Sequence, residues 1–254
     1  MTIGNPLVEL IRVNSTNSYA GQLYADNVAS DGMVIWAHEQ FAGRGQGDHA
    51  WSSEAGMNLT ITVCLQPHFL PPDRQFRLNK AISLGVLDFM RSFPVHVSGG
   101  MPQSFSIKWP NDIYYGEKKT GGILIEHRIM GPLLDASFVG IGLNINQTTF
   151  APDIPNPVSL VQIIQKETVI KVALMSLCAC LEGRYQELRD SDSEKLDDEY
   201  DQNLLGYGQW RTFLMQDIST EGKTEGVDQS GRLMLLLQSG ERILGNHGEV
   251  SLVK

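Results

Sequence analysis

A glycine-rich segment from Gln40 to Trp51 combines residue types that bind small anionic ligands. Arg44 and Gln46 alternate in it with three glycines: Gly43, Gly45 and Gly47. Glycines let successive backbone N–H groups approach an anion, and the permanently charged guanidinium of Arg44 suits a carboxylate or a phosphate. Trp51 adds a flat face that can pack or stack on a base. A flexible glycine hairpin would show the same pattern, so this segment alone leaves the function open.

Three later segments also place polar groups beside strands or turns. Lys108-Trp109-Pro110-Asn111-Asp112 presents an amide and a carboxylate at a proline turn, although Asn and Asp also cap ordinary turns. Lys119-Thr120-Gly121-Gly122 combines a compact positive charge with an open backbone, and an exposed hairpin lysine is the simpler alternative. Gly140-Ile141-Gly142-Leu143-Asn144 puts two glycines on one face of a strand, where a ligand or another backbone can come close.

The composition is that of an ordinary globular protein of 254 residues with a net charge of −9. The acidic charge argues against nucleic acid as the main partner. No apolar run reaches membrane-spanning length, and the N-terminus lacks the features of a secretion signal. Cys64, Cys178 and Cys180 form no disulfide framework, which indicates core thiols in a reducing cytoplasm. The pattern leaves open whether the protein is a monomer or a homodimer.

The elements that must position these segments are mostly strands in the first part of the chain. Expected strands flank the glycine segment at 33–37 and 59–65, and this order excludes a Rossmann site, in which a helix follows the glycines. Helices are expected at about 14–29 and 71–93, and Ser98-Gly99-Gly100 is expected to break the chain. The other strands are expected at 7–13, 104–109, 114–126 with a turn at 116–119, and 134–145.

The pattern changes after Pro157. Residues 158–189 are predicted to be helical, and the seven acidic residues between Asp190 and Asp201 indicate a solvated face. Short strands separated by turn signals follow, which is typical of a small SH3-like barrel; they are expected at 210–215, 221–227, 233–238, 242–244 and 250–253. We therefore expect a first domain over residues 1–204 and a barrel over residues 205–254.

Taken together and in this order, the segments resemble the motifs of the biotin–protein ligase family over nearly the whole chain. The family patterns read S-T-N, G-R-G-R-x-G-x-x-W, K-W-P-N-D, K-x-x-G-I-L-x-E and G-x-G-x-N, and they correspond here to 15–17, 43–51, 108–112, 119–126 and 140–144. The resemblance implies an α+β fold like that of class II aminoacyl-tRNA synthetases, with a mixed, mostly antiparallel sheet, helices on one side and the barrel. Too few residues precede Asn14 for the N-terminal DNA-binding domain of some relatives, so we expect the form without it.

The resemblance implies a two-step, ATP-dependent ligase. The carboxylate of biotin attacks the α-phosphorus of MgATP, giving biotinyl-5′-AMP and pyrophosphate; a lysine of a biotin carboxyl carrier domain then displaces AMP. The implied partners are ATP, Mg²⁺, biotin and the carrier domain of a carboxylase, without DNA or membrane. Because the first step brings two anionic groups together, it needs fixed positive charge. Arg44 and Lys119 are therefore the predicted catalytic residues.

The other implied roles divide into two sets. Biotin binding is assigned to Ser15, Thr16, Asn17, Gln40, Gly43, Arg44, Gly45, Gln46, Lys119, Gly122, Gly140 and Gly142. ATP or adenylate binding is assigned to Arg44, Trp51, Asn111, Asp112, Lys119 and Asn144. In this set Trp51 stacks on adenine, and Asp112 holds magnesium or a neighbouring cation; no resident metal site is expected.

Two departures from the family pattern and two alternative functions remain. Gln46 stands where many relatives have a second arginine, which predicts faster release of the adenylate. His49 and Ala50 stand where basic residues are frequent, which weakens the positive field of the loop.

A lipoate ligase or octanoyltransferase shares the fold, but its different glycine motif is absent here. A non-catalytic module that binds biotin or an adenylate is the other alternative, and the retained Arg44 and Lys119 argue against it.

Overall fold

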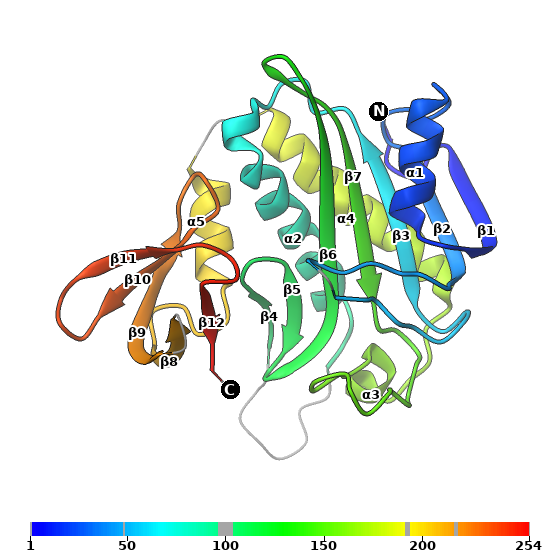
Figure 1. Cartoon of the computed structure of the whole chain (residues 1–254). Helices are drawn as coiled ribbons and strands as arrows, with labels where there is room; N and C mark the ends of the chain where they lie inside the picture. The colour runs from blue at the N-terminus through cyan, green and yellow to red at the C-terminus, as the bar shows by residue number, and fades with distance from the viewer. Residues whose placement is uncertain (1, 48, 96–103, 191–193, 216–217, 254) are drawn as a thin grey trace.

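A computed structural model describes residues 2–47, 49–95, 104–190, 194–215 and 218–253; the chain break predicted at Ser98–Gly100 lies outside these ranges. The largest element is a seven-stranded mixed sheet with the order β1-β2-β3-β7-β6-β5-β4 (Figure 1). Its strands are β1 (Leu7–Val13), β2 (Val34–Gln40), β3 (Leu59–Leu65), β4 (Phe105–Lys108), β5 (Asp112–Tyr115), β6 (Lys118–Met130) and β7 (Leu133–Leu143). Only the β1–β2 pair in this sheet is parallel.

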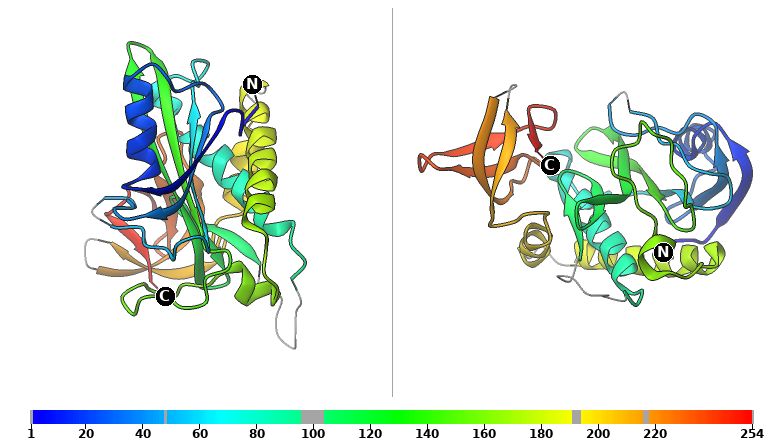
Figure 2. Two further views of the ribbon diagram at one scale, coloured as in Figure 1. Left: turned by 90° about the vertical axis from the view of Figure 1, so that its right-hand side faces the viewer. Right: turned by 90° about the horizontal axis from the view of Figure 1, so that it is seen from below.

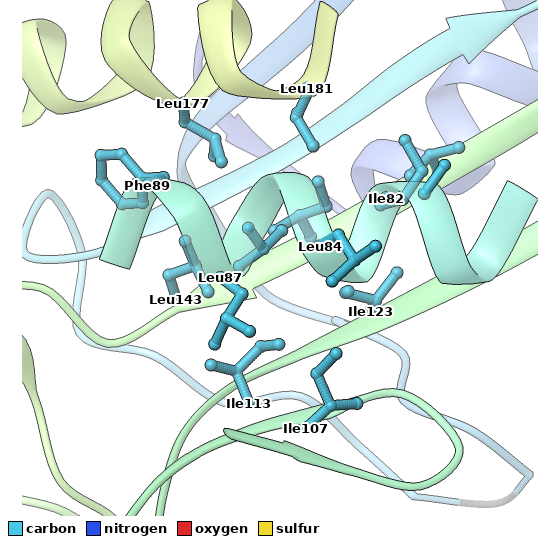
Figure 3. Close-up of a cluster of buried hydrophobic side chains, with 14 of the residues drawn as sticks. Ile82, Leu84, Leu87, Phe89, Ile107, Ile113, Ile123, Leu143, Leu177 and Leu181 are labelled. Atoms are coloured by element: carbon cyan, nitrogen blue, oxygen red, sulfur yellow. The ribbon is translucent and has the colours of Figure 1, made fainter. Parts of the chain in front are cut away.

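The main core lies between this sheet and two stacked helices. Helix α2 (Phe76–Arg91) follows a short 3₁₀ turn (Pro72–Arg74) and packs on the sheet, and α4 (Ile170–Asp190) packs on α2. Leu84 and Leu87 lie between sheet residues such as Ile113 and the α4 residue Leu177 (Figure 3). The expected fold class, a mixed sheet followed by a small β unit, is confirmed.

The expectation that helices cover one side of the sheet is wrong in one respect. Helix α1 (Thr16–Ala25) lies on the opposite face from α2 and α4 (Figure 2). It covers a second apolar cluster that includes Ala20, Ile35, Cys64 and Phe138. Since every residue of β3 is buried, both faces of the central strands need cover, as in sheets with helices on both faces.

The predicted helix over 158–189 is two helices. Helix α3 (Leu160–Ile164) begins at Ser159, where Ser159 and Gln162 form a capping box. It ends at Gln165, whose φ of 57° is in the left-handed region that ends a helix. The chain then enters α4 in a new direction, so α3 lies below the sheet and α4 behind α2 (Figure 1).

The C-terminal unit comprises strands β8–β12 and lies beside the β4–β5 edge of the large sheet, with α5 (Lys195–Gln202) next to it (Figure 1). Its antiparallel sheet has the order β11-β10-β9-β8-β12. The strands are β8 (Trp210–Met215), β9 (Ile218–Val227), β10 (Leu233–Leu237), β11 (Arg242–Gly245) and β12 (Val250–Leu252).

The acidic segment is only partly the solvated face that its charge predicts. Asp197 of α5 lies 2.8 Å from Nζ of Lys80, whose side chain is 3% exposed. Asp201 accepts a 3.1 Å hydrogen bond from the backbone N–H of Val227 in β9. These acidic residues thus join α2 and α5 to the C-terminal unit.

Candidate active site

The face of the sheet that carries α1 has a floor made of residues with small side chains. In antiparallel register, Asp112, Gly122, Gly142 and Thr60 form one row across β5, β6, β7 and β3. Because residues paired across neighbouring strands project to the same face, the row points its side chains toward α1 and the glycine segment. The missing side chains of Gly122 and Gly142 leave room above it.

A cavity of about 650 Å³ lies over this floor. All the predicted site residues except Gly43 line it: Ser15, Thr16, Asn17, Gln40, Arg44, Gly45, Gln46, Trp51, Asn111, Asp112, Lys119, Gly122, Gly140, Gly142 and Asn144. The backbone carbonyl of Gly43 instead accepts a 2.9 Å hydrogen bond from the N–H of Trp51 and closes the glycine hairpin. Tertiary structure therefore brings together segments that are up to about 130 residues apart in the chain.

Gly140 and Gly142 of β7 leave space that the side chains of Asn17 and Trp51 occupy. A Cβ at Gly140 would lie 2.5 Å from Oδ1 of Asn17, and a Cβ at Gly142 would lie 2.4 Å from the indole ring of Trp51. Nε1 of Trp51 and Oε1 of Gln46 are buried at the cavity without a hydrogen-bond partner among the described residues. A buried donor or acceptor without a partner is costly, so both atoms favour a polar ligand in this cavity.

Neutral polar side chains from the start of α1 and from Gln40 line one part of the cavity. Oε1 of Gln40 accepts hydrogen bonds from the backbone N–H and the hydroxyl of Thr16, at 2.7 and 3.0 Å. Oδ1 of Asn17 accepts from the hydroxyl of Thr62 at 2.6 Å. Ser15, Thr16 and Asn17 are all buried at the start of α1. These contacts fix the amide and hydroxyl groups before any ligand binds.

Arg44 lies at the mouth of the cavity on the glycine hairpin. The hairpin is closed by a bridge between Arg44 and Ala50 and by a 2.7 Å hydrogen bond from the N–H of Gly45 to the carbonyl of His49. Nη2 of Arg44 lies 2.7 Å from Oε2 of Glu126 in β6, and the two side chains are 47% and 32% exposed. The sequence analysis missed this partner because the residues are 82 positions apart.

Lys119 lies deeper in the cavity and faces Asp112. Nζ of Lys119 and Oδ1 of Asp112 are 2.7 Å apart, with 28% and 25% of the side chains exposed. The β5–β6 register shifts by one residue between Ile113 and Tyr114. Such a bulge turns the side chains that follow it to the other face, and here it puts Lys119 on the same face as Gly122. In this structure the cation that Asp112 holds is Lys119.

The two asparagines of the predicted nucleotide set brace backbone segments around the cavity. The side-chain amide of Asn111 donates to the carbonyl of Ile123, and that of Asn144 donates to the carbonyl of Val158 at 3.3 Å. Tyr114 lines the cavity beside them, and burial raises the pKa of its hydroxyl to about 12. Tyr114 is therefore a neutral group at physiological pH.

Two further regions line the cavity, and sequence reasoning did not assign them to the site. The first is the proline-rich segment after Asn146, which contributes Phe150, Asp153 and Ile154. The second is the C-terminal unit, which contributes Phe213, Leu233, His247 and residues 250–252. Burial lowers the pKa of His247, so its imidazole is neutral near pH 7. The cluster of prolines in the first region could have indicated an ordered loop beside the site. The sequence of the C-terminal strands contains no local pattern that indicates that these strands reach the cavity.

The described residues contain no group of three His, Cys, Asp or Glu side chains close enough to hold a metal ion. Within the same ranges, no helix is both long and apolar enough to span a membrane. Cys64, Cys178 and Cys180 are free thiols, and burial raises the pKa of Cys64 to about 12 and that of Cys178 to about 11. Cys64 and Cys178 are thus buried core residues, Cys180 is half-buried against the core, and none of the three lines the cavity.

The chain is similar to biotin protein ligases both in structure and in sequence. The biotin protein ligase of Aquifex aeolicus in complex with biotin and ATP matches with a TM-score of 0.77 and 26% identity, over 98% of both chains. The biotin–[acetyl-CoA-carboxylase] ligase of Paracoccus denitrificans is 29% identical over 247 residues, which cover 92% of this chain and 96% of that relative. The bifunctional ligase/repressor BirA of Bacillus subtilis is 26% identical over 95% of this chain and 72% of its own length.

The model of the biotin/lipoate A/B protein ligase family matches residues 9–144. The chain belongs to this family, as the motifs predict.

Proposed function

We propose that the protein is an ATP-dependent biotin–protein ligase, which joins biotin to a lysine of a biotin carboxyl carrier domain through biotinyl-5′-AMP. The observation that carries the proposal is one cavity lined both by neutral hydrogen-bonding side chains and by the cations Arg44 and Lys119. Biotin has an uncharged ureido ring and an anionic carboxylate, so it matches this combination of groups. The ligase names and the biotin–ATP complex among the similar proteins support the same reading.

In the first step, an oxygen of the biotin carboxylate attacks the α-phosphorus of ATP, and the bond to pyrophosphate breaks. Arg44 and Lys119 offset the repulsion between the two anions and stabilise the charge that develops on the phosphorus oxygens. Gln40, Thr16 and Asn17 orient the ureido ring. Trp51 stacks on adenine, and Asn111 and Asn144 position the nucleotide.

In the second step, the neutral amine of the carrier lysine attacks the carbonyl of the mixed anhydride; the new C–N bond forms and AMP leaves with its electron pair. The amine must lose a proton to react, so the transfer rate rises with pH toward mildly alkaline values. Of the carboxylates that line the cavity, Asp112 would be the one to meet Mg²⁺ bound to the phosphates of ATP, where the ion would offset their negative charge. We further propose a boundary between the two domains at residues 204 and 205, and a reducing cytoplasmic setting for the three free thiols.

The test is to incubate the protein with MgATP, a biotin carboxyl carrier domain and either biotin or lipoate, and to follow the carrier by intact mass spectrometry. A mass gain with biotin alone supports the proposal. A mass gain with lipoate instead would move the protein to the lipoate branch of the family. Tight biotin binding without any transfer would instead identify a non-catalytic binding module.

A further inference from the structure

Glu126 contacts the site from outside the cavity. Its Oε2 accepts a hydrogen bond from Nη2 of Arg44 at 2.7 Å and another from Nδ2 of Asn17 at 2.8 Å. Both donors line the cavity, whereas Glu126 does not. One carboxylate oxygen thus connects Asn17, a residue of the expected biotin pocket, with the cationic side chain of Arg44.

The two partners of Glu126 differ in how firmly they are held. Asn17 is buried at 4% exposure, accepts a hydrogen bond from Thr62 and lies against Gly140. Arg44 is 47% exposed and sits on a glycine hairpin. Because exposed ion pairs contribute little free energy, Arg44 can leave Glu126 at a small cost, while Asn17 stays in place.

The strand geometry keeps Glu126 at this point. Gly122, Leu124 and Glu126 alternate along β6 and therefore face the α1 side of the sheet together. Glu126 pairs with Phe138 of β7, beyond the glycine floor. The carboxylate is thus fixed to the rigid sheet, and the part that can move is the hairpin with Arg44.

We propose that Glu126 is a positioning residue that holds Arg44 at the mouth of the cavity and competes with the anionic ligand for its guanidinium. This inference rests on the proposed function for the identity of that ligand, the phosphate of the adenylate. When the phosphate binds, Arg44 exchanges the carboxylate of Glu126 for it. Glu126 thereby sets the affinity for anionic ligands without touching them.

The test compares Glu126→Gln with wild type for two stable ligands. Biotinol-5′-AMP carries the anionic phosphodiester, and biotinamide is neutral. Glutamine keeps an oxygen that accepts from Asn17 but removes the charge that holds Arg44. We expect biotinol-5′-AMP to bind about two- to fivefold more tightly to the variant, and biotinamide to bind equally, since an exposed ion pair is worth about that factor. Glu39→Gln is the matched control, because Glu39 forms a similarly exposed strand pair with Arg12 at 3.1 Å.

Limited trypsin cleavage gives a second readout of the same variants. Without ligand, the bond after Arg44 should be cut faster in Glu126→Gln than in wild type or Glu39→Gln, and bound biotinol-5′-AMP should protect all three. Equal or weaker binding of biotinol-5′-AMP to Glu126→Gln would overturn the inference, as would an unchanged cleavage rate. If wild type bound neither ligand, the proposed function itself would fail, which is a distinguishable result.

Discussion

At the scale of single residues, Arg44 and Lys119 each pair with a carboxylate of the same sheet, but they are anchored differently. The backbone N–H of Lys119 donates to the carbonyl of Asn156 at 2.8 Å, and its carbonyl accepts from Val158 at 2.9 Å. Lys119 is therefore fixed on both sides, whereas Arg44 is carried by the glycine hairpin. Under the proposed function, Lys119 is therefore the more firmly anchored of the two charges, and Arg44 is the one that can exchange its carboxylate partner for the ligand.

Lys119→Ala should abolish most of the adenylation activity. Loss of one preorganised group that stabilises developing charge lowers a rate by about 10²–10³-fold. The measurement is pyrophosphate release with biotin and ATP in the absence of a carrier. Lys118→Ala is the matched control, because the neighbouring lysine is exposed and does not line the cavity. An equal loss in both variants would contradict the assigned role.

Gln46→Arg should slow the release of biotinyl-5′-AMP. Gln46 lines the cavity, and its Oε1 is buried there without a partner among the described residues. An arginine would add a charged hydrogen bond to the phosphate, worth about 1.5–3 kcal/mol, or about ten- to a hundredfold in the dissociation rate. Stopped-flow measurement of adenylate release checks this value, and an unchanged off-rate would remove the hypothesis.

At the scale of elements, β7 and the glycine hairpin form one functional unit. Gly142 lies opposite Thr60 of β3 and Gly122 of β6, in the middle of the floor. Trp51 packs directly on it, since the nearest indole atoms would touch a Cβ there. The glycine of the strand and the tryptophan of the hairpin therefore depend on each other, although they belong to motifs about 90 residues apart.

Gly142→Ala should displace Trp51 and weaken nucleotide binding. A methyl group 2.4 Å from the indole forces the ring away from the sheet. We expect about a five- to a hundredfold loss in affinity for a non-hydrolysable ATP analogue, because base–aromatic stacking is worth about 1–3 kcal/mol. Calorimetry with biotin present gives the constant, and tryptophan fluorescence reports the displacement.

Gly183→Ala is the control for that substitution. Its Cβ would meet nothing within 4 Å, and it lies in α4, away from the cavity. It should bind the analogue like wild type and be slightly more stable, because alanine favours a helix. Unchanged nucleotide affinity in Gly142→Ala would show that Trp51 does not act through this contact.

At the scale of the whole molecule, the C-terminal unit is part of the site and is joined to the first domain by a buried polar cluster. Lys80 of α2 contacts Asp197, donates to the carbonyl of Val227 at 3.1 Å and lies 5.5 Å from the ring centre of Tyr200. Burial raises the pKa of the nearby Asp201 to about 6, partly offset by Lys80. This joint fixes the position of the C-terminal residues that line the cavity.

Asp201→Asn should make the stability of the protein less dependent on pH between about 4 and 6. The folded pKa of Asp201, about 6, exceeds its unfolded value. The neutral carboxyl group therefore adds stability at low pH that is lost as the pH rises through about 6. Asparagine keeps the acceptor for Val227 without the charge, so the variant should exceed wild type by about 1–2 kcal/mol at pH 8 and by less at pH 5.

Urea unfolding at the two pH values measures this difference. Asp197→Asn is the contrasting variant, because it leaves the buried ammonium of Lys80 without its carboxylate and should destabilise the fold by about 3 kcal/mol at both pH values. A pH-independent loss of stability in Asp201→Asn would contradict the prediction.

Short-range patterns in the sequence predicted individual strands and the motif residues of the candidate site. The strict alternation of residues 59–65 predicted β3, and residues 7–13 were predicted as the strand β1, both with the bounds that the structure has. The motifs identified residues that line one cavity, because each is a local combination of residue types with its own chemistry. The family assignment followed from the order of these motifs along the chain.

Tertiary structure alone decided which groups face each other. Helix α1 lies on the opposite face from α2, so both faces of β3 are buried, including the face with Thr60 and Thr62 that an alternating pattern predicts to be exposed. Glu126 meets Arg44, and the C-terminal unit reaches the cavity, through contacts between residues far apart in the chain. Such contacts depend on register, bulges and packing of whole elements, so no local pattern specifies them.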